Sequence, residues 1–404
     1  YRFNDPFGGV QVIFIGDMFQ LSPVALEEEW RILSQYYQSP YFFHSQVILK
    51  NPPVYIEFDK IFRQSNQEFI SLLNEVRNDR LTDEGLLKLQ SRYDPTFIPP
   101  TDDTFITLTT HNYKADKINA EELLKLKGKT YRFEAKITGD FPEKSFPTDK
   151  VLELKTGAKV MFIKNDTESE RRFYNGKIGI IRQIENDVIF IDCQNESEPI
   201  ELSRVQWENI RYKTNDETKT IEEETLGTFV QFPIRLAWAI TIHKSQGLTF
   251  EKAVIDAGDA FAPGQVYVAL SRCRSLEGIV LRSRINPYSI ENDRQIVEYE
   301  KNKMPTEMLE EILQNSMKDF RKELLLQFYD FRQGIGQISR LQKDVLEVAG
   351  SFNEDTLPYL KDIQSQIQQL QEIAVKFQKQ VTSILENPNP NEEYLNERIT
   401  AANT

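Results

Sequence analysis

Residues 236–250 read LAWAITIHKSQGLTF, and both the fold and the chemistry that we predict start from this stretch. An apolar run, which we interpret as helical, leads into a dense polar cluster, then a glycine, then a strand. The cluster offers small or polar donors suited to the phosphates of a nucleic-acid backbone, namely Thr241, His243 and Ser245. Gln246 and Gly247 follow, and they place an amide side chain and a bare backbone next to a bound ligand.

Two arginines lie near this stretch in the expected fold. Residues 264–272 (GQVYVALSR) predict a short helix with an apolar face, which puts Arg272 at a helix end beside the sheet. Upstream, Arg63 in the sequence IFRQ (61–64) precedes a predicted helix, and its planar fork can neutralise charge on a transferring phosphoryl group. Two arginines that converge on one phosphate would form a charge clamp. The competing interpretation of Arg63 is a surface ion pair.

A third motif, GDMFQLSPV at 16–24, follows an apolar run at 10–15 (VQVIFI). We expect that run to be a buried parallel strand. Ligands of open α/β sheets bind beyond the carboxyl ends of the strands, so we expect Asp17 and Gln20 at a ligand-binding edge. A glutamine there can donate to a phosphate oxygen and orient an attacking water. The alternative is a plain turn that ends the strand.

Short apolar runs alternate with helical patterns over most of residues 1–302, which favours an α/β fold with a parallel sheet. The runs lie at 10–15, 104–108 and 253–256, and the helical patterns at 67–78, 113–126 and 265–272. Residues 151–230 break this rhythm with close-spaced β-rich segments, which predict a small inserted barrel. Those segments are 151–154, 158–163, 177–184, 188–193 and 198–202, with turns at 175–176 and 186–187 and a solvated acidic loop at 215–224.

Residues 303–404 have a different pattern, in which apolar residues recur at steps of three and four. This pattern is typical of a coiled coil. A break at 350–353 predicts two long helices folded into a hairpin, and a short helix follows near 392–400. Such a hairpin either packs within the protein or serves as an arm that binds a protein partner or self-associates.

Composition excludes several classes. The 404 residues contain no apolar run long enough to span a membrane, so we expect no membrane partner. Cys193 and Cys273 lie far apart without a Cys-x-x-Cys motif, which argues against a disulfide framework or a metal site. The net charge of −13 argues against a protein that coats nucleic acid, although a narrow polar track along one strand does not need a basic surface.

These motifs, in this order, resemble superfamily 1 DNA helicases, and more narrowly their Pif/RecD-like branch, superfamily 1B. GDMFQLSPV resembles the third helicase motif, FRQ the fourth, AITIHKSQGLTF the fifth and VYVALSRCRSLEGI the sixth. Residues 108–119 (LTTHNYKADKIN) resemble the family's threonine-asparagine segment, and 155–165 with 175–179 resemble its SH3-like insertion. The resemblance covers about residues 1–285 and leaves the helical tail to be assigned by periodicity alone.

The resemblance implies a role for each matching residue. Gln20, Arg63 and Arg272 would be catalytic, with Gln20 sensing the γ-phosphate and the arginines acting as fingers on it. Asp17, Gln64, Gln246 and Gly247 would line the nucleotide cleft. The single-stranded DNA would be contacted by Thr110, His111, Asn112, Thr241, His243 and Ser245. The intact protein would use ATP and Mg²⁺ and move 5′ to 3′ on single-stranded DNA.

The resemblance also implies a domain layout. Residues 1–47 would be the last part of a first RecA-like domain, and 48–150 with 231–300 a second one. The SH3-like barrel would occupy 151–230, and the coiled-coil tail 303–404. The sequence contains no Gly-x-x-x-x-Gly-Lys-Ser/Thr loop, and the resemblance implies that both Walker segments precede the position of Tyr1.

We therefore expect this fragment to bind no nucleotide and to hydrolyse no ATP by itself. We also expect a cytoplasmic, nucleoid-associated protein. The alternative is a degenerate helicase-like scaffold that binds DNA or protein without ATP turnover. An unrelated α/β phosphotransferase would need a phosphate loop of its own.

Overall fold

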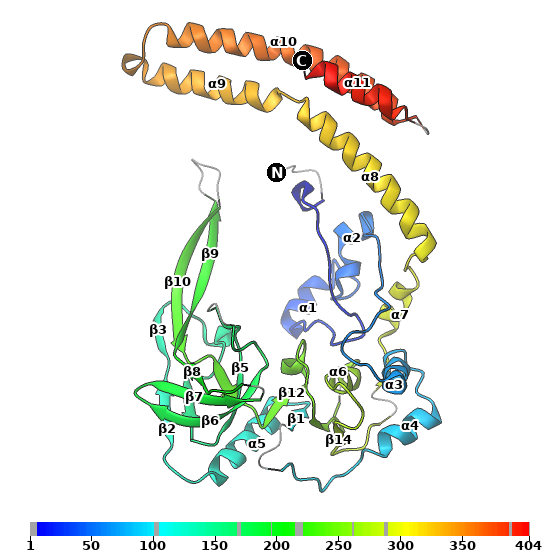
Figure 1. The fold of residues 1–404 in the computed structure, drawn as a ribbon, viewed down its shortest axis with the longest axis vertical. Coiled ribbons are helices and arrows are strands. Elements are labelled where there is room, and N and C mark those ends of the chain that lie inside the picture. Colours follow the sequence, from blue (N-terminus) through cyan, green and yellow to red (C-terminus); the bar gives the residue numbers. More distant parts are fainter. Residues whose placement is uncertain are drawn as a thin grey trace. The chain divides into compact units, whose positions relative to one another are not determined.

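The computed structural model describes residues 6–100, 105–167, 171–194, 196–214, 221–260, 262–286, 290–387 and 390–403. The chain forms two compact units, Tyr1–Asn302 and Lys303–Thr404 (Figure 1). The first unit contains the sheets and the shorter helices, and the second is entirely helical in its regular elements.

A four-stranded parallel sheet is the centre of the first unit. Its strand order is β12-β1-β13-β14. In register, Thr109 of β1 lies beside Thr241 of β12 on one side and Asp256 of β13 on the other. Three strands therefore end at one carboxyl edge, although β12 lies 130 residues away from β1 in the sequence. The strands are β1 (Ile106–Thr109), β12 (Ala239–Thr241), β13 (Ala253–Asp256) and β14 (Ile279–Leu281).

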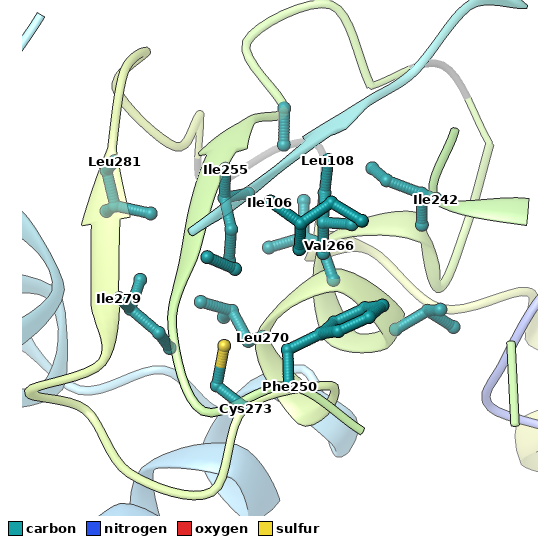
Figure 2. Close-up of a cluster of buried hydrophobic side chains, with 14 of the residues drawn as sticks. Ile106, Leu108, Ile242, Phe250, Ile255, Val266, Leu270, Cys273, Ile279 and Leu281 are labelled. Carbon is teal, nitrogen blue, oxygen red and sulfur yellow. The ribbon is translucent and has the colours of Figure 1, made fainter. Parts of the chain in front are cut away.

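Helix α6 packs on this sheet and closes the main hydrophobic core. Figure 2 shows Ile106 and Leu108 of β1, Ile255 of β13 and the β14 side chains meeting Val266 and Leu270 of α6. Each fully buried aliphatic side chain of this kind stabilises the fold by roughly 1.5–3 kcal/mol. Side chains of α3 and α4 complete the cluster. The helices are α3 (Gln67–Arg77), α4 (Asp83–Gln90) and α6 (Gln265–Ser271).

Helix α5 (Asn112–Lys125) covers the open edge of β12. The Asn119 side chain donates to the carbonyl oxygen of Ala239 at 2.8 Å and accepts from its amide at 2.9 Å. One side chain thus replaces a strand neighbour, which is how an exposed sheet edge is protected. The same contacts fix the start of α5 beside the ends of β1 and β12.

Antiparallel strands form a second part of the first unit. A five-stranded sheet of order β11-β5-β6-β7-β8 encloses a second core with the β2–β4 pair, and β9 and β10 form a long ribbon bordered by β3 (Figure 1). The insert was predicted at 151–230, but two of its strands pair with strands outside those bounds. Strand β4 pairs with β2, which precedes residue 151, and β5 pairs with β11, which follows residue 230. The strands are β2 (Tyr131–Glu134), β3 (Lys136–Gly139), β4 (Val151–Leu154), β5 (Lys159–Phe162), β6 (Ile178–Glu185), β7 (Val188–Cys193), β8 (Ile200–Leu202), β9 (Val205–Thr214), β10 (Ile221–Gln231) and β11 (Ile234–Leu236).

The N-terminal segment is anchored by aromatic packing. Phe19, Phe43 and Ile48 form a small core with Ile296. The Tyr41 hydroxyl donates to Asp293 Oδ2 at 2.8 Å. The contacts of this core come from α2 (Gln46–Lys50), α7 (Arg294–Glu300) and the 3₁₀ turn at Phe42–His44. Other short elements of the first unit are α1 (Glu27–Leu33) and 3₁₀ turns at Pro6–Gly9, Glu143–Ser145 and His243–Ser245.

In the first unit, two predicted elements were wrong and a third was wrong in part. Residues 10–15 are exposed and extended rather than a buried strand, because no described strand pairs with them. The apolar run at 236–242, predicted as helical, forms the end of β11 and all of β12, since β5 and β1 pair with it. Of the acidic loop predicted at 215–224, Ile221–Glu224 belong to β10, and 215–220 lie outside the described residues.

The second unit is a bundle of antiparallel helices. Helix α10 packs against α9, which runs back along it, and against the C-terminal end of α8, where Leu325 and Leu326 lie (Figure 1). The first long helix that we predicted is two helices, because the chain breaks at 329–331. There Gln378 Nε2 donates to the carbonyls of Leu326 and Tyr329, so the broken end keeps its hydrogen bonds. The helices are α8 (Thr306–Phe328), α9 (Arg332–Glu347), α10 (Thr356–Leu385) and α11 (Glu392–Ala402), with a 3₁₀ turn at Ala349–Ser351.

Among the residues that the structure describes, no helix has the length and apolar content needed to cross a membrane.

Candidate nucleotide and DNA-binding site

Five predicted site residues meet around α6. Asp17 and Gln20 lie at its N-terminal end, and Arg63, Gln64 and Arg272 at its C-terminal end. We call these five residues the α6 cluster. They come from three segments of the chain that are separated by tens to hundreds of residues.

Gly264 allows the loop of Asp17 to lie against α6. Its φ of 78° is in the left-handed region, and a Cβ there would collide with the carbonyl oxygens of Phe19 and Gln20. Only glycine satisfies both demands. Within the loop, the Asp17 carboxylate accepts from the Phe19 amide and from Gln20 Nε2, each at 3.1 Å. The Gln20 side chain is thereby held beside the start of α6.

The other end of α6 is held by Arg63 and Gln64. Arg63 Nη1 donates to the Ser271 carbonyl at 3.2 Å. The buried Gln64 donates from Nε2 to the carbonyls of Ser271 and Cys273, at 3.1 and 2.9 Å. Because both amide hydrogens of Gln64 are used inside the protein, its predicted place among nucleotide ligands is not supported. Gln64 instead fixes the backbone on either side of Arg272.

Arg272 is 1% exposed. Its guanidinium donates to the carbonyls of Val268 and Leu248 and to Ser271 Oγ, at 3.0, 3.4 and 3.0 Å. Burial, followed by the nearby charge of Arg63, lowers the pKa of Arg272 to about 10, so it stays charged at neutral pH. We predicted that Arg272 reaches a phosphate directly. In this structure it is enclosed, and the half-buried Arg63 is the more accessible of the two.

Two further residues complete the α6 cluster, and sequence reasoning missed both. Arg77 Nε lies 3.9 Å from Asp17 Oδ1, and its guanidinium covers the Phe19 ring at 4.4 Å. Burial, together with the nearby carboxylate of Asp17, raises the pKa of Tyr267 to about 12. In the sequence, Tyr267 is one residue of a helical pattern, and no local signal marks Arg77.

The predicted DNA contacts meet at the carboxyl edge of β1 and β12. We call Thr110, His111, Asn112, Thr241 and His243 the carboxyl edge. Thr110 Oγ1 lies 2.7 Å from His111 Nδ1, and Thr241 Oγ1 accepts from the Lys244 amide at 3.3 Å. Asn112 and His243 are exposed, whereas Thr110 and Thr241 are buried side chains at the strand ends.

The 3₁₀ turn after β12 decides which polar side chains reach the surface. His243, Lys244, Gln246 and Gly247 are exposed, as expected for ligand contacts. Ser245 is fully buried, and its hydroxyl donates to the Ile242 carbonyl at 2.7 Å. In this structure the Ser245 hydroxyl closes the turn, and its predicted contact with DNA stays a prediction.

Charge at this edge is modest. Although His243 is exposed, partial desolvation of its imidazole by neighbouring atoms lowers the pKa of His243, so the ring is less readily protonated than usual. Burial, and then the neighbouring Arg235, lower the pKa of Lys244. Lys244 was overlooked in the sequence, although it adjoins His243. In the described part of the chain, no group of three or more His, Cys, Asp or Glu side chains could hold a metal ion.

Known proteins resemble this chain in sequence and fold. The structure of Bacteroides sp Pif1 in complex with ADP-AlF4 matches with a TM-score of 0.65 and 41% identity, over 74% of this chain and 68% of that one. The chain belongs to the Pif1 helicase family. Human ATP-dependent DNA helicase PIF1 is 35% identical over 307 residues, which cover 73% of this chain and 44% of the human protein. Pif1 from Psychrobacter sp. is 34% identical, over 69% of this chain and 49% of its own length.

The Pif1 relatives bear on two further points. The chain spans somewhat less than half the length of these two curated relatives. A family model described as the middle domain of DNA helicases matches residues 312–404. The helical tail, which our motif comparison left unassigned, thus also resembles a helicase segment.

Proposed function

We propose that this chain is the motor portion of an ATP-dependent DNA helicase that moves 5′ to 3′ on single-stranded DNA. The observation that carries the proposal is the meeting of Arg63 and Arg272 at one end of α6, with Gln20 and Asp17 at the other. Relatives named as ATP-dependent DNA helicases, and the solved complex of Bacteroides sp Pif1 with ADP-AlF4, support this use of the cluster.

The positive charges of the α6 cluster favour a bound phosphate group. Burial, and after it the charge of Arg63, lowers the pKa of Arg272; the repulsion between the two guanidinium groups favours an anion beside them. ATP, when bound, supplies the γ-phosphoryl group that water attacks. Arg63 would bind that phosphate, because it has to give up only its bond to the Ser271 carbonyl. We assign no residue of this chain to Mg²⁺.

The remaining cluster residues would act through position. The Gln20 side chain, which Asp17 holds by a hydrogen bond, would point toward the phosphate. Gln246 and Gly247 would border the nucleotide. Arg272 would contribute its charge after exchanging its bond to the Leu248 carbonyl for the phosphate. The carbonyl belongs to the residue next to Gly247, so this exchange would link the nucleotide to the turn that carries His243.

The carboxyl edge would hold the DNA backbone. Hydroxyl, amide and imidazole donors on the ends of adjacent strands can follow the phosphates of a single strand without a basic surface. A relative with a solved complex with single-stranded DNA, Bacteroides Pif1, supports this assignment at 41% identity and a TM-score of 0.57. DNA as the substrate would also favour a place at the nucleoid.

The five-stranded sheet with the β2–β4 pair would be the SH3-like insert of this family, and the parallel sheet the second RecA-like domain. Residues 1–47, which carry Gln20, would belong to the first RecA-like domain. These domain assignments rest on the order of the motifs and on the strand pairing described above.

The direct test uses the 404-residue chain. We expect it to bind oligo(dT) and to show no DNA-stimulated ATP hydrolysis, because its sequence holds no phosphate-cradling loop. Robust hydrolysis by the pure chain would refute that part of the proposal. Undetectable DNA binding would refute the proposed DNA function and leave only the scaffold that binds protein.

For the second unit we propose self-association through one face of α8. Leu313, Met317, Phe320, Leu324 and Phe328 recur at steps of three and four and are each 49–68% exposed. Leu325 packs against α10 from another face of the helix. These steps of three and four are the spacing of a coiled-coil seam, which pairs with an equivalent face of another helix. We therefore take its occupant to be a second copy of the chain.

Sedimentation of the full chain tests this. We expect a dimer, and a monomer for the double variant Leu313→Glu/Phe320→Glu. Met308→Glu is the matched control, since Met308 is equally exposed on the same helix but outside the stripe. A monomeric parent chain at all concentrations would overturn the proposal.

A further inference from the structure

Tyr113 is an exposed aromatic side chain beside the carboxyl edge. It is the second residue of α5, and it is 64% exposed. Its ring centroid lies 5.5 Å from that of His111, with the ring planes tilted by 49°. His111 in turn contacts Thr110. Tyr113 therefore adjoins the donors that would hold the DNA backbone.

Nothing in the packing of α5 requires a large side chain at this position. The helix is held from its other sides, by buried Ala115 and by the Asn119 bonds to β12. Tyr113 belongs to none of the hydrophobic clusters of the described residues. An exposed tyrosine ring presents a large, flat apolar face with few rotatable bonds, which is the kind of surface on which bases stack.

The neighbouring cation, Lys114, does not offer the DNA a free positive charge in place of the Tyr113 ring. Lys114 Nζ lies 2.6 Å from Asp259 Oδ2 and 3.5 Å from Asp256 Oδ2, so its charge is largely neutralised within the protein. A strand that passes the start of α5 thus meets an aromatic face rather than a free positive charge.

We propose that Tyr113 stacks on a base of the single strand whose phosphates lie along the carboxyl edge. The ligand is a nucleobase of any kind, because every base has a π-face. This inference rests on the proposed DNA function, and it adds a base contact to an edge otherwise made of phosphate donors. It predicts that part of the affinity for DNA is independent of salt, since stacking releases no counterions.

The test is a binding cycle on the full chain. Anisotropy gives the affinity for oligo(dT) and for the same oligomer with abasic sites, with the parent chain, Tyr113→Ala and Tyr113→Phe. Loss of one stacked base by alanine substitution costs about 1–3 kcal/mol, or about 5- to 150-fold in Kd. We expect Tyr113→Ala to weaken oligo(dT) binding within that range with an unchanged salt slope, and Tyr113→Phe to bind within twofold of the parent.

The abasic oligomer separates stacking from other causes. We expect Tyr113→Ala to bind it nearly as well as the parent chain does. The matched control is Tyr359→Ala, because Tyr359 is 65% exposed in the first turn of α10, and it should change no affinity. An equal loss on both oligomers, or no loss on either, overturns stacking while the DNA function stands. A parent chain that binds neither oligomer overturns the proposed DNA function, and the stacking inference with it.

Discussion

The α6 cluster and the carboxyl edge are both built on the same parallel sheet, yet they differ in how they hold their polar groups. In the α6 cluster, Arg272 and Gln64 are buried and bonded to backbone carbonyls. At the carboxyl edge, Asn112 and His243 are exposed. A site that acts on charge developing in a reaction gains from fixed, water-excluded donors. A track that repeatedly binds and releases a strand gains from exposed, weaker contacts. The predictions below test that division.

Arg63→Ala should have the largest effect. In a full-length protein that contains these residues together with a P-loop, we expect kcat for ATP hydrolysis to fall by about 10³-fold or more, because an arginine finger acts on transition-state charge. Affinity for single-stranded DNA should change by less than about twofold. Steady-state kinetics and anisotropy measure the two effects. A parallel loss of both would mean that the two regions are not separate.

Gly264→Ala should destabilise the fold more than any change at the carboxyl edge. Alanine at position 264 would have to keep a left-handed φ, and its Cβ would collide with the Phe19 and Gln20 carbonyls. We therefore expect the free energy of unfolding to fall by about 3 kcal/mol or more. Gly247→Ala is the control, since it has the same φ of 78° but open space around its Cβ. It should cost roughly 1–2 kcal/mol. Urea unfolding gives both values, and equal costs would contradict the packing described here.

His243 should give the edge a small pH dependence. Because partial desolvation lowers its pKa, the imidazole is neutral at pH 7 and gains a proton only below the ordinary value of about 6.5. Affinity for single-stranded DNA should therefore rise a few-fold as the pH falls from 7 toward 5. The unfolded chain protonates first, so the native state loses stability over the same interval. His243→Gln should flatten both trends, and a pH profile unchanged by the substitution would remove His243 from the track.

Elements with a strong local signal could be predicted from the sequence. Strands β4 and β7 have the bounds that the pattern predicts, and the turn before β7 uses Asn186 and Asp187, both at positive φ. The start of α3 follows from Asn66, whose side chain accepts from the Phe69 amide. In each case neighbouring residues in the sequence decide the structure.

Other features depend on neighbours that the sequence does not reveal. The apolar run at 236–242 fits a helix or a buried strand equally well, and pairing with β1 decides for a strand. Motif matching listed Ser245 and Gln64 as ligand contacts, yet their polar atoms are used by backbone carbonyls. Exposure and hydrogen-bond partners, rather than residue type, distinguish a residue that contacts a ligand from one that holds the backbone in place.

The most direct test of the division is one anisotropy titration of labelled oligo(dT) with the 404-residue chain and two variants. The account predicts salt-dependent binding by the parent chain, at least about tenfold weaker binding by Thr241→Ala/His243→Ala, and binding within twofold of the parent by Arg63→Ala. An equal loss in both variants, or full affinity in the edge variant, would contradict it.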